Sequence, residues 1–328
     1  MTELSVVIPV YGCAGCLRDL HARLGPAVER ITSSYELIFV DDASEDGSWD
    51  LLAELSRADP QVRAFRLSRN YGQHAAITAG LEKSRGNRVV VMDCDLQDPP
   101  EDIPRLYAKA SEGYDVVFGK RRSKPTSWHR RALANLYFSL LNRFTGAQID
   151  GQQGSFSIIS RKVVEAFLGF RDRDRHYLLI LRWLGFSSAV VDYQPAERSH
   201  GRSSYSLGRL LKHALDGVFF QTTVLLRWIV YLGFVLALAG VGGAAYIAIA
   251  KIAGNAAPGW TSLAVFTLTI GGFIIISTGV TGLYIGKIFE QVKGRPLYVF
   301  DRELSGGVEV SAGDRTAART ESPDRPAG

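Results

Sequence analysis

The sequence predicts an α/β domain with a mostly parallel sheet, followed by an amphipathic helix and two membrane-spanning helices. Short apolar runs alternate with helical patterns over residues 1–205, and this alternation is typical of a parallel sheet covered on both faces. Residues 206–227 have amphipathic helical spacing. Two uncharged segments follow, 228–250 and 261–286, and each exceeds the roughly 20 residues that a helix needs to cross a bilayer.

The predicted strands are the apolar runs of the front part of the chain: Leu4–Val10, Glu36–Val40, Val62–Leu67, Arg88–Met92 and Asp115–Phe118. The segments between them have the spacing of helices, and they are Cys16–Arg30, Ser48–Arg57, Tyr71–Ser84 and Glu101–Glu112. In open sheets of this class ligands bind beyond the carboxyl ends of the strands. Polar residues directly after each run are therefore the first candidates for a functional site.

The back part of the chain is expected to meet a membrane. Residues 206–227 carry leucines on one helical face and basic residues on the other, which is typical of a helix lying in the membrane interface. Packing of this helix on the soluble domain is the alternative. Lys and Arg flank the two uncharged segments on both sides, so the positive-inside rule places the domain of residues 1–205 and the C-terminus in the cytoplasm. Residues 301–328 are polar and small, and we expect them to be disordered.

Charge and cysteine content narrow the possible classes. The net charge is +5, but the basic residues form no long block, and several flank the apolar segments. This favours a membrane surface over nucleic acid as the partner. Three cysteines in 328 residues argue against a disulfide framework and fit a reducing compartment. Cys13 and Cys16 have C-x-x-C spacing, but no second pair or nearby His supports a zinc or redox site.

Two carboxylates, Asp93 and Asp95, directly follow the strand Arg88–Met92, and Gln97 comes two residues later. Mg²⁺ and Mn²⁺ prefer oxygen ligands and are usually held by one or two carboxylates together with substrate phosphates. Such an ion would neutralise the charge that builds up on a departing diphosphate. A lone D-x-D is also common on solvated turns, but its position after a buried strand favours the metal site.

A second acidic pair, Asp41 and Asp42, follows the strand Glu36–Val40 in the same way. A carboxylate at a strand end can accept hydrogen bonds from the edge of a nucleobase. The alternative is a turn and N-cap cluster for the next helix, and it applies most strongly to Ser44 and Asp46.

Four stretches carry a resemblance to a known family: Ser5–Tyr11, Val40–Ser44, Leu67–Gly72 and Asp93–Pro100. Together they resemble the family 2 glycosyltransferases with a GT-A fold. More closely, they are similar to the polyprenyl-phosphate glycosyltransferases, the group that includes dolichol-phosphate mannose synthase and the bactoprenol glucosyltransferases. The resemblance covers residues 4 to about 295 and includes both apolar segments.

The resemblance implies a membrane enzyme that moves a sugar from a UDP- or GDP-linked donor to a polyprenyl phosphate at the cytoplasmic face. Inversion at the anomeric carbon, dependence on Mg²⁺ or Mn²⁺ and assembly into a homo-oligomer such as a tetramer are implied with it. No nucleic acid is expected as a partner.

The resemblance also implies roles for residues at matching positions. Asp93, Asp95 and Gln97 would hold the metal, and the two aspartates would act in catalysis together with Arg122 and Arg198. The nucleotide end would be contacted by Pro9, Tyr11, Asp41, Asp42, Arg69 and Asn70.

Basic loops are expected to bind phosphate, because Arg pairs bidentately with phosphate oxygens. Gly119–Arg122 resembles the family's G-x-R segment. Arg198–Ser203 resembles its R-x-x-G-x-S loop, which would place Arg202 and Ser203 at the lipid phosphate. The arginines expected to face the strand ends are Arg121, Arg122, Arg130, Arg131, Arg198 and Arg202. Ordinary solvated surface arginines are the alternative for each of them.

The sequence departs from the family pattern in three places. Gly12-Cys13 replaces the usual Asn-Glu, Ser204 stands where Lys is usual, and Gly154–Ser157 replaces a G-D-F-R segment. Position 155 therefore lacks a carboxylate that could serve as a base. A hydroxyl acceptor needs a base, whereas a phosphate monoester, with a second pKa of about 6, is already an oxyanion at neutral pH. The departure favours a phosphate acceptor.

Four other interpretations compete with this one. A processive polysaccharide synthase would need Q-x-x-R-W and more spans, and Leu179 stands at the Gln position before Arg182-Trp183. A glycosyltransferase acting on a non-lipid glycan stays open. A non-catalytic membrane scaffold is disfavoured because both carboxylates of the D-x-D are present. A dehydrogenase is disfavoured because no G-x-G-x-x-G follows the first strand.

Overall fold

The computed structural model describes residues 2–122, 153–170, 172, 175–196, 224–252 and 259–311. The described residues divide into two compact units. The first unit contains those up to residue 122, those from 153 to 196, and those from Arg295 onward. The second unit contains 224–252 and 259–294.

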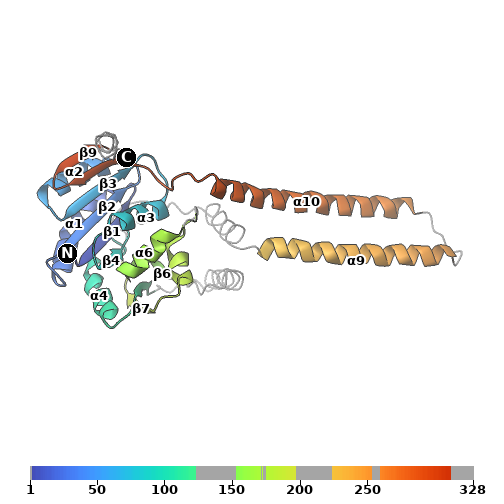
Figure 1. Ribbon diagram of the computed structural model, residues 1–328, viewed down its shortest axis with the longest axis horizontal. Coiled ribbons are helices and arrows are strands. Elements are labelled where there is room, and N and C mark those ends of the chain that lie inside the picture. The colour runs from blue at the N-terminus through green and yellow to red at the C-terminus, as the bar shows by residue number, and fades with distance from the viewer. Residues whose placement is uncertain are drawn as a thin grey trace, which may run out of the picture. The chain divides into compact units, whose positions relative to one another are not determined.

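The first unit is built on a nine-stranded mixed sheet with the order β7-β5-β6-β4-β1-β2-β3-β8-β9 (Figure 1). The four strands β1 to β4 run parallel, β5 and β7 are parallel to each other, and β6, β8 and β9 are antiparallel to their neighbours. The bounds are β1 Leu4–Val10, β2 Tyr35–Asp41, β3 Val62–Leu67, β4 Arg88–Val91, β5 Val116–Arg121, β6 Gln153–Ser160, β7 Ser188–Tyr193, β8 Phe300–Ser305 and β9 Val308–Ser311. The predicted α/β class with a mostly parallel sheet is confirmed.

Helices cover both faces of this sheet, which explains why its central strands are continuous apolar runs rather than alternating ones. One face packs on α1 (Ala14–Glu29), α2 (Ser48–Ala58) and α4 (Ile103–Ser111), which follows the 3₁₀ turn Pro100–Asp102. The other packs on α3 (Gln73–Lys83), α6 (Arg161–Gly169) and α7 (Tyr177–Trp183). Every residue of β1 and β2 is buried as a result.

The close fit of α3 on β1 depends on Gly80. A Cβ at this position would lie 2.3 Å from Cγ1 of Val7 and 3.2 Å from Cγ2 of Val40. No side chain fits that space, so the glycine allows the helix to approach the sheet. This approach fixes the start of α3, at Gln73, beside the carboxyl ends of the strands.

The expectation that residues 301–328 are disordered is wrong for its first part. Residues 300–311 form β8 and β9, and β8 pairs antiparallel with β3, with Arg63 opposite Ser305 and Leu67 opposite Phe300. The physical reason is that Leu304 is buried and Phe300 packs against Phe65, so this short segment has the apolar side chains that the edge of the sheet needs. The average composition of residues 301–328 is polar, and it did not indicate these few apolar side chains. Residues 312–328 lie outside the described part.

The second unit contains two long helices, α9 (Val224–Ile252) and α10 (Trp260–Val292). They contact each other where Gly233 meets the ring of Phe273. Their outer surfaces expose large apolar side chains such as Leu238 and Ile275. Of the described helices, one segment, Ile270–Val292, is long and apolar enough to cross a membrane, and the apolar stretch of α9, Ile229–Gly240, is shorter.

The predicted spans 228–250 and 261–286 are therefore helical, and their crossing of a membrane stays a prediction. The predicted interfacial helix at 206–227 falls mostly on residues outside the described part, because α9 begins at Val224.

Candidate active site

The loops after β1, β2 and β4 meet at one edge of the sheet, because these strands are parallel neighbours. In such a sheet this edge is where ligands bind. The loop after β1 is held in place by side chains of the loop after β2. The backbone N of Gly12 donates to Oγ of Ser44 at 3.2 Å, and the backbone N of Ala14 donates to Oδ2 of Asp46 at 2.9 Å.

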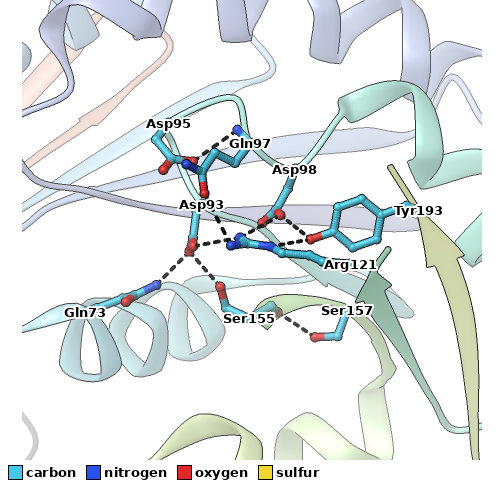
Figure 2. A network of polar contacts seen from close by, with 9 residues as sticks. All are labelled: Gln73, Asp93, Asp95, Gln97, Asp98, Arg121, Ser155, Ser157 and Tyr193. Atoms are coloured by element: carbon cyan, nitrogen blue, oxygen red, sulfur yellow. Dashed lines mark hydrogen bonds and ion pairs between the residues drawn. The ribbon is translucent and has the colours of Figure 1, made fainter. Parts of the chain in front are cut away.

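Asp93 is at the centre of a polar network at this edge (Figure 2). Its Oδ1 accepts hydrogen bonds from Nε2 of Gln73 and from Oγ of Ser155, both at 2.6 Å. About a quarter of its side chain, 26%, is exposed. Burial raises the pKa of Asp93 to about 6, and the nearby charges of Asp98 and Asp95 add to the effect against the opposing contacts of Ser155 and Arg121. A cation bound here would relieve this crowding of negative charge.

Asp95 and Gln97 lie in the same loop and turn back on each other. The backbone N of Gln97 donates to Oδ1 of Asp95 at 3.1 Å. Between them, Leu96 adopts a left-handed conformation with φ of 62°, which costs roughly 1–2 kcal/mol for a residue with a Cβ. Its side chain is buried in the core, which offsets the cost. The strained turn allows Leu96 to enter the core while its two neighbours stay at the surface of the loop.

The donor set of Asp93, Asp95 and Gln97 fits Mg²⁺ or Mn²⁺. Within the described ranges, no three His, Cys, Asp or Glu residues gather into a complete metal site. One or two carboxylates are nevertheless the usual protein contribution for these ions, because substrate phosphates and water complete the coordination. The amide oxygen of Gln97 would be a further ligand of the oxygen type that they prefer.

Arg121, at the end of β5, reaches this network. It was expected to face the strand ends, but the catalytic role was predicted for Arg122. Its Nη2 lies 2.9 Å from Oδ1 of Asp98 and 3.9 Å from Oδ2 of Asp93, and its Nη1 donates to Oε1 of Gln97 at 3.3 Å. Burial alone would lower the pKa of Arg121, but the charge of Asp98 and the contact with Tyr193 raise it above its ordinary value. Arg121 is therefore a permanent cation beside the candidate metal ligands.

The structure does not bring Arg122 to the same place. Its side chain is exposed, and its backbone N donates to the carbonyl of Tyr193 at 2.9 Å. Successive side chains of an extended segment point to opposite sides, so only one of two adjacent arginines can face the carboxylates. The sequence feature that favours Arg121 over Arg122 is the G-x-R pattern, because Arg121 stands two residues after Gly119.

Gly119 itself has a packing role. A Cβ there would lie 2.8 Å from Cδ1 of Phe156 and 3.0 Å from Cε1 of Tyr193. These two rings pack edge to face with centroids 5.2 Å apart. Glycine at this position therefore allows Tyr193 to lie against β5, where its hydroxyl reaches Arg121 and Asp98.

Asp42 holds the loop Ser68–Gly72. Its Oδ1 accepts from the backbone N of Tyr71 at 2.7 Å and its Oδ2 from the backbone N of Gly72 at 2.8 Å. Burial raises the pKa of Asp42 in spite of these hydrogen bonds and of the nearby Arg69 charge. The expected contact of Asp42 with a nucleobase stays a prediction. In the structure this carboxylate holds the neighbouring loop through two backbone hydrogen bonds.

The other expected nucleotide contacts differ in their exposure. Asp41 is fully buried, and its Oδ1 accepts from the backbone N of Ser44, so the turn interpretation fits this residue. Pro9 is also buried, within β1. Tyr11 is 58% exposed. The guanidinium of Arg69 lies 4.3 Å from the centroid of the Tyr71 ring. Arg69 and Asn70 are both exposed.

The remaining expected residues, Arg130, Arg198, Arg202 and Ser203, lie outside the described part of the chain. Their predicted roles at the acceptor phosphate stay predictions.

A disulfide joins Cys13, in the loop after β1, to Cys94, between the two aspartates of the D-x-D. The C-x-x-C pair is not a unit, because Cys16 is free and buried. The cysteine content argued against a disulfide framework, and the described residues contain this single disulfide. The reason is topological: β1 and β4 are adjacent parallel strands, so residues 81 apart in the sequence meet at their ends.

No role was predicted from the sequence for four residues of the network: Gln73, Ser155, Asp98 and Tyr193. Ser155 was considered only as the position of a missing carboxylate, and the structure brings its hydroxyl to Asp93. Asp98 is part of the same D-x-D-L-Q-D stretch, which was the available signal for it.

Comparison with known proteins gives the family. The chain matches the model of glycosyl transferase family 2 over residues 5–168. It is 36% identical over 299 residues to the glycosyltransferase sll0501 of Synechocystis sp., which covers 90% of this chain and 94% of that protein. It is 33% identical over 309 residues to the glycosyltransferase YkcC of Bacillus subtilis, covering 94% of this chain and 95% of that one.

Among solved structures, glucosyl-3-phosphoglycerate synthase from Mycobacterium tuberculosis aligns with a TM-score of 0.47 at 20% identity, over 67% of this chain and 80% of that chain. Similarity of that degree says nothing about what this chain binds. The family match over half of the chain, and two relatives that align over nearly its whole length, show that the chain belongs to glycosyl transferase family 2 and is a glycosyltransferase.

Proposed function

We propose that the chain transfers a sugar from a nucleotide-diphosphate sugar to a polyprenyl phosphate at the cytoplasmic face of a membrane, with inversion and with Mg²⁺ or Mn²⁺. The observation that carries the proposal is the position of Asp93. Burial and neighbouring carboxylates raise its pKa, and it lies at the edge of the sheet where ligands bind.

At the donor end, Asp93, Asp95 and Gln97 would hold the ion through oxygen atoms. When bound, the ion supplies positive charge to the diphosphate that leaves with the nucleotide. Arg121 adds a second positive charge beside these ligands, and guanidinium groups bind phosphate oxygens bidentately. The exposed ring of Tyr11 and the Arg69–Tyr71 pair, on the neighbouring loops, offer surfaces for the nucleotide.

At the acceptor end, the chemistry of position 155 supports a phosphate. Ser155 donates its hydroxyl proton to Asp93 at 2.6 Å, so it acts as a hydrogen-bond donor to the metal ligand. A phosphate monoester needs no base at this position, because its attacking oxygen is already charged at neutral pH. A sugar hydroxyl would need one.

The second unit supports an acceptor that is held in a membrane. α10 contains the apolar segment Ile270–Val292, and both α9 and α10 expose large apolar side chains. Soluble proteins rarely expose contiguous apolar surface of this kind. A lipid-linked phosphate is the acceptor that such a chain would meet at the membrane surface.

The test is a transfer assay with the full-length chain in lipid nanodiscs. Radiolabelled UDP- and GDP-sugars are supplied with Mn²⁺ and either undecaprenyl phosphate or a soluble oligosaccharide. We expect one donor to give labelled lipid, and chelation with EDTA to abolish the product. Label on the oligosaccharide alone would reject the lipid acceptor, and no transfer from any donor would reject the proposal as a whole.

The matched variant in this assay is Asp93→Ala. We expect it to lower kcat on the order of 10³-fold, since the ion contributes several kcal/mol of charge stabilisation. Asp102→Ala, at the start of α4, removes a carboxylate that pairs with Arg105 and is expected to change kcat less than about twofold. An Asp93→Ala chain with full transfer activity would contradict the metal-dependent mechanism.

A further inference from the structure

Arg121 lies between two carboxylates that compete for it. Its Nη2 is 2.9 Å from Oδ1 of Asp98 and 3.9 Å from Oδ2 of Asp93 (Figure 2). The side chain of Asp98 is fully buried, whereas that of Asp93 is 26% exposed. The Arg121 guanidinium therefore makes a close ion pair with the buried carboxylate and only a long contact with the candidate metal ligand.

Tyr193 strengthens the pairing with Asp98. Its hydroxyl donates to Oδ1 of Asp98 at 2.5 Å and accepts from Nε of Arg121 at 2.8 Å. It thus bridges the two charged groups. The ring cannot easily move away, because it packs against Phe156 and against the space that Gly119 leaves open.

The 1 Å difference between the two contacts has a chemical consequence. Arg is always charged and readily forms a bidentate pair with a carboxylate. An Arg121 released from Asp98 still has Oδ2 of Asp93 within 3.9 Å of its Nη2. A guanidinium paired with Asp93 would occupy the oxygen that a divalent cation needs.

We propose that Asp98, together with Tyr193, is a positioning residue that keeps the Arg121 guanidinium off Asp93, so that Asp93 stays available to a divalent cation. The inference rests on the metal site of the proposed function and deepens it. Asp98 acts through Arg121 and does not itself contact the ion.

The experiment measures Mn²⁺ binding directly, by the electron paramagnetic resonance signal of free Mn²⁺, on the full-length chain with no donor or acceptor present. Asp98→Asn keeps the shape of the side chain and removes its charge. We expect this variant to bind Mn²⁺ about tenfold more weakly, because the freed guanidinium then competes for Asp93. In the Arg121→Gln background, the same Asp98→Asn change is expected to weaken binding less than about threefold, since no competing cation remains.

The comparison of backgrounds separates two explanations. If Asp98 attracts the ion by its own charge or ligates it, Asp98→Asn loses the same factor with and without Arg121, and the inference is overturned. Unchanged Mn²⁺ affinity in Asp98→Asn overturns it as well. A wild-type chain that binds no Mn²⁺ at all would remove the metal site of the proposed function, which is a different result from the first two.

Two further variants distinguish a specific loss of Mn²⁺ binding from a folding defect. Tyr193→Phe removes only the bridging hydroxyl and keeps the ring, and we expect it to weaken Mn²⁺ binding two- to threefold in the same direction. Asp102→Asn makes the same chemical change as Asp98→Asn in the pair with Arg105, and Mn²⁺ affinity is expected to stay within twofold of the wild type. If Asp98→Asn does not fold, an unchanged affinity in Tyr193→Phe overturns the inference on its own.

Discussion

At the scale of single residues, the Asp93 carboxylate accepts two hydrogen bonds and makes only a long contact with a cation. Gln73 and Ser155 both donate to the same oxygen, Oδ1, while Oδ2 faces Arg121 at 3.9 Å. Such an arrangement fixes the orientation of the carboxylate without neutralising it. An oriented and uncompensated carboxylate is suited to bind a cation.

This arrangement predicts how Mn²⁺ binding depends on pH. The pKa of Asp93 is raised to about 6, chiefly by burial, so protons compete with the ion as the pH falls through that value. We expect Mn²⁺ affinity to be nearly constant from pH 8 to 7 and to fall by up to about tenfold per unit below pH 6. Mn²⁺ titrations of the full-length chain between pH 5 and 8 measure this affinity. Equal affinities at pH 5 and pH 7 would contradict the prediction.

The raised pKa of Asp93 also determines how the free energy of unfolding depends on pH. A carboxyl whose pKa is raised on folding is more easily protonated in the folded state than in the unfolded chain. Its charged form therefore destabilises the fold most at neutral pH, and this effect is relieved as the pH falls toward the pKa of the unfolded chain. Without metal, the contribution of Asp93 to the free energy of unfolding is therefore expected to be more favourable at pH 5 than at pH 7. Saturating Mn²⁺ is expected to reverse this trend.

Sequence reasoning located part of this site and missed the rest for a physical reason. Asp93, Asp95 and Gln97 were found because they follow a buried strand in one short stretch. Gln73, Ser155 and Tyr193 come from three other elements, and no local pattern shows that those elements meet. Arg122 was chosen over Arg121 because the side that each faces depends on the alternation of β5, which ends at Arg121.

At the scale of elements, the five predicted strands are present with ends within two residues of expectation, except that β5 runs on to Arg121. Their buried apolar runs were the strongest signal in the sequence. β6 and β7 gave weaker ones. β6 includes glycine and three serines, and β7 is an edge strand whose outward side chains are exposed. A strand that is covered on one side only lacks the continuous run that marked the others.

The strand β8, which lies between β3 and the edge strand β9, makes a testable contribution to stability. Leu304 is 1% exposed and belongs to the core cluster of the sheet. Replacing Leu304 by Ala is expected to lower the free energy of unfolding by about 2–3 kcal/mol, because it removes buried methyl groups and leaves a cavity. Thermal unfolding of the purified chain measures the change.

The control for this prediction is Val308→Ala in β9, where the side chain is 64% exposed. This variant is expected to change the free energy of unfolding by less than about 0.5 kcal/mol. Equal effects of the two substitutions would mean that β8 is not packed on the sheet.

The disulfide between Cys13 and Cys94 links the loops after β1 and β4. It closes a segment of 81 residues in the unfolded chain, and a cross-link over that length is expected to stabilise the fold by about 2–4 kcal/mol. A reducing agent should therefore lower the unfolding temperature of the wild type and leave that of Cys94→Ser unchanged. Cys16→Ser, which keeps the disulfide, should respond as the wild type does. Equal unfolding temperatures with and without reductant would contradict the linkage.

At the scale of the whole molecule, the chain combines a mixed-sheet unit with a unit made of two long helices. These parts differ in charge along the sequence, since 228–250 and 261–286 contain no charged residue. Charge patterning acts over tens of residues, and it is therefore easier to read than the pairing of single side chains. Charge patterning could not show that the chain returns to the sheet after Arg295.

Membrane insertion of α10 can be tested with a charge at an exposed position. Ile275 is 74% exposed and lies at the middle of α10 (Trp260–Val292), within its apolar segment Ile270–Val292. Ile275→Arg is expected to reduce the carbonate-resistant membrane fraction markedly, because a central Arg costs about 2.5–3.5 kcal/mol on insertion scales. Ile288→Arg, near the end of the segment and 61% exposed, should have a smaller effect, because an Arg there can extend to the interface. Equal membrane fractions for Ile275→Arg and the wild type would argue against a spanning α10.

The return of the chain to its first unit affects the order in which the protein is completed. During synthesis both long helices are made before β8 and β9 exist, because these strands come last in the described sequence. Until then β3 has one bare edge, with backbone groups open to any other extended segment. A fragment cut before residue 224 would keep that edge for good. The longer chain covers that edge of β3 with β8 and ends the sheet in the four-residue strand β9, and so short an edge strand offers another chain few backbone groups to pair with.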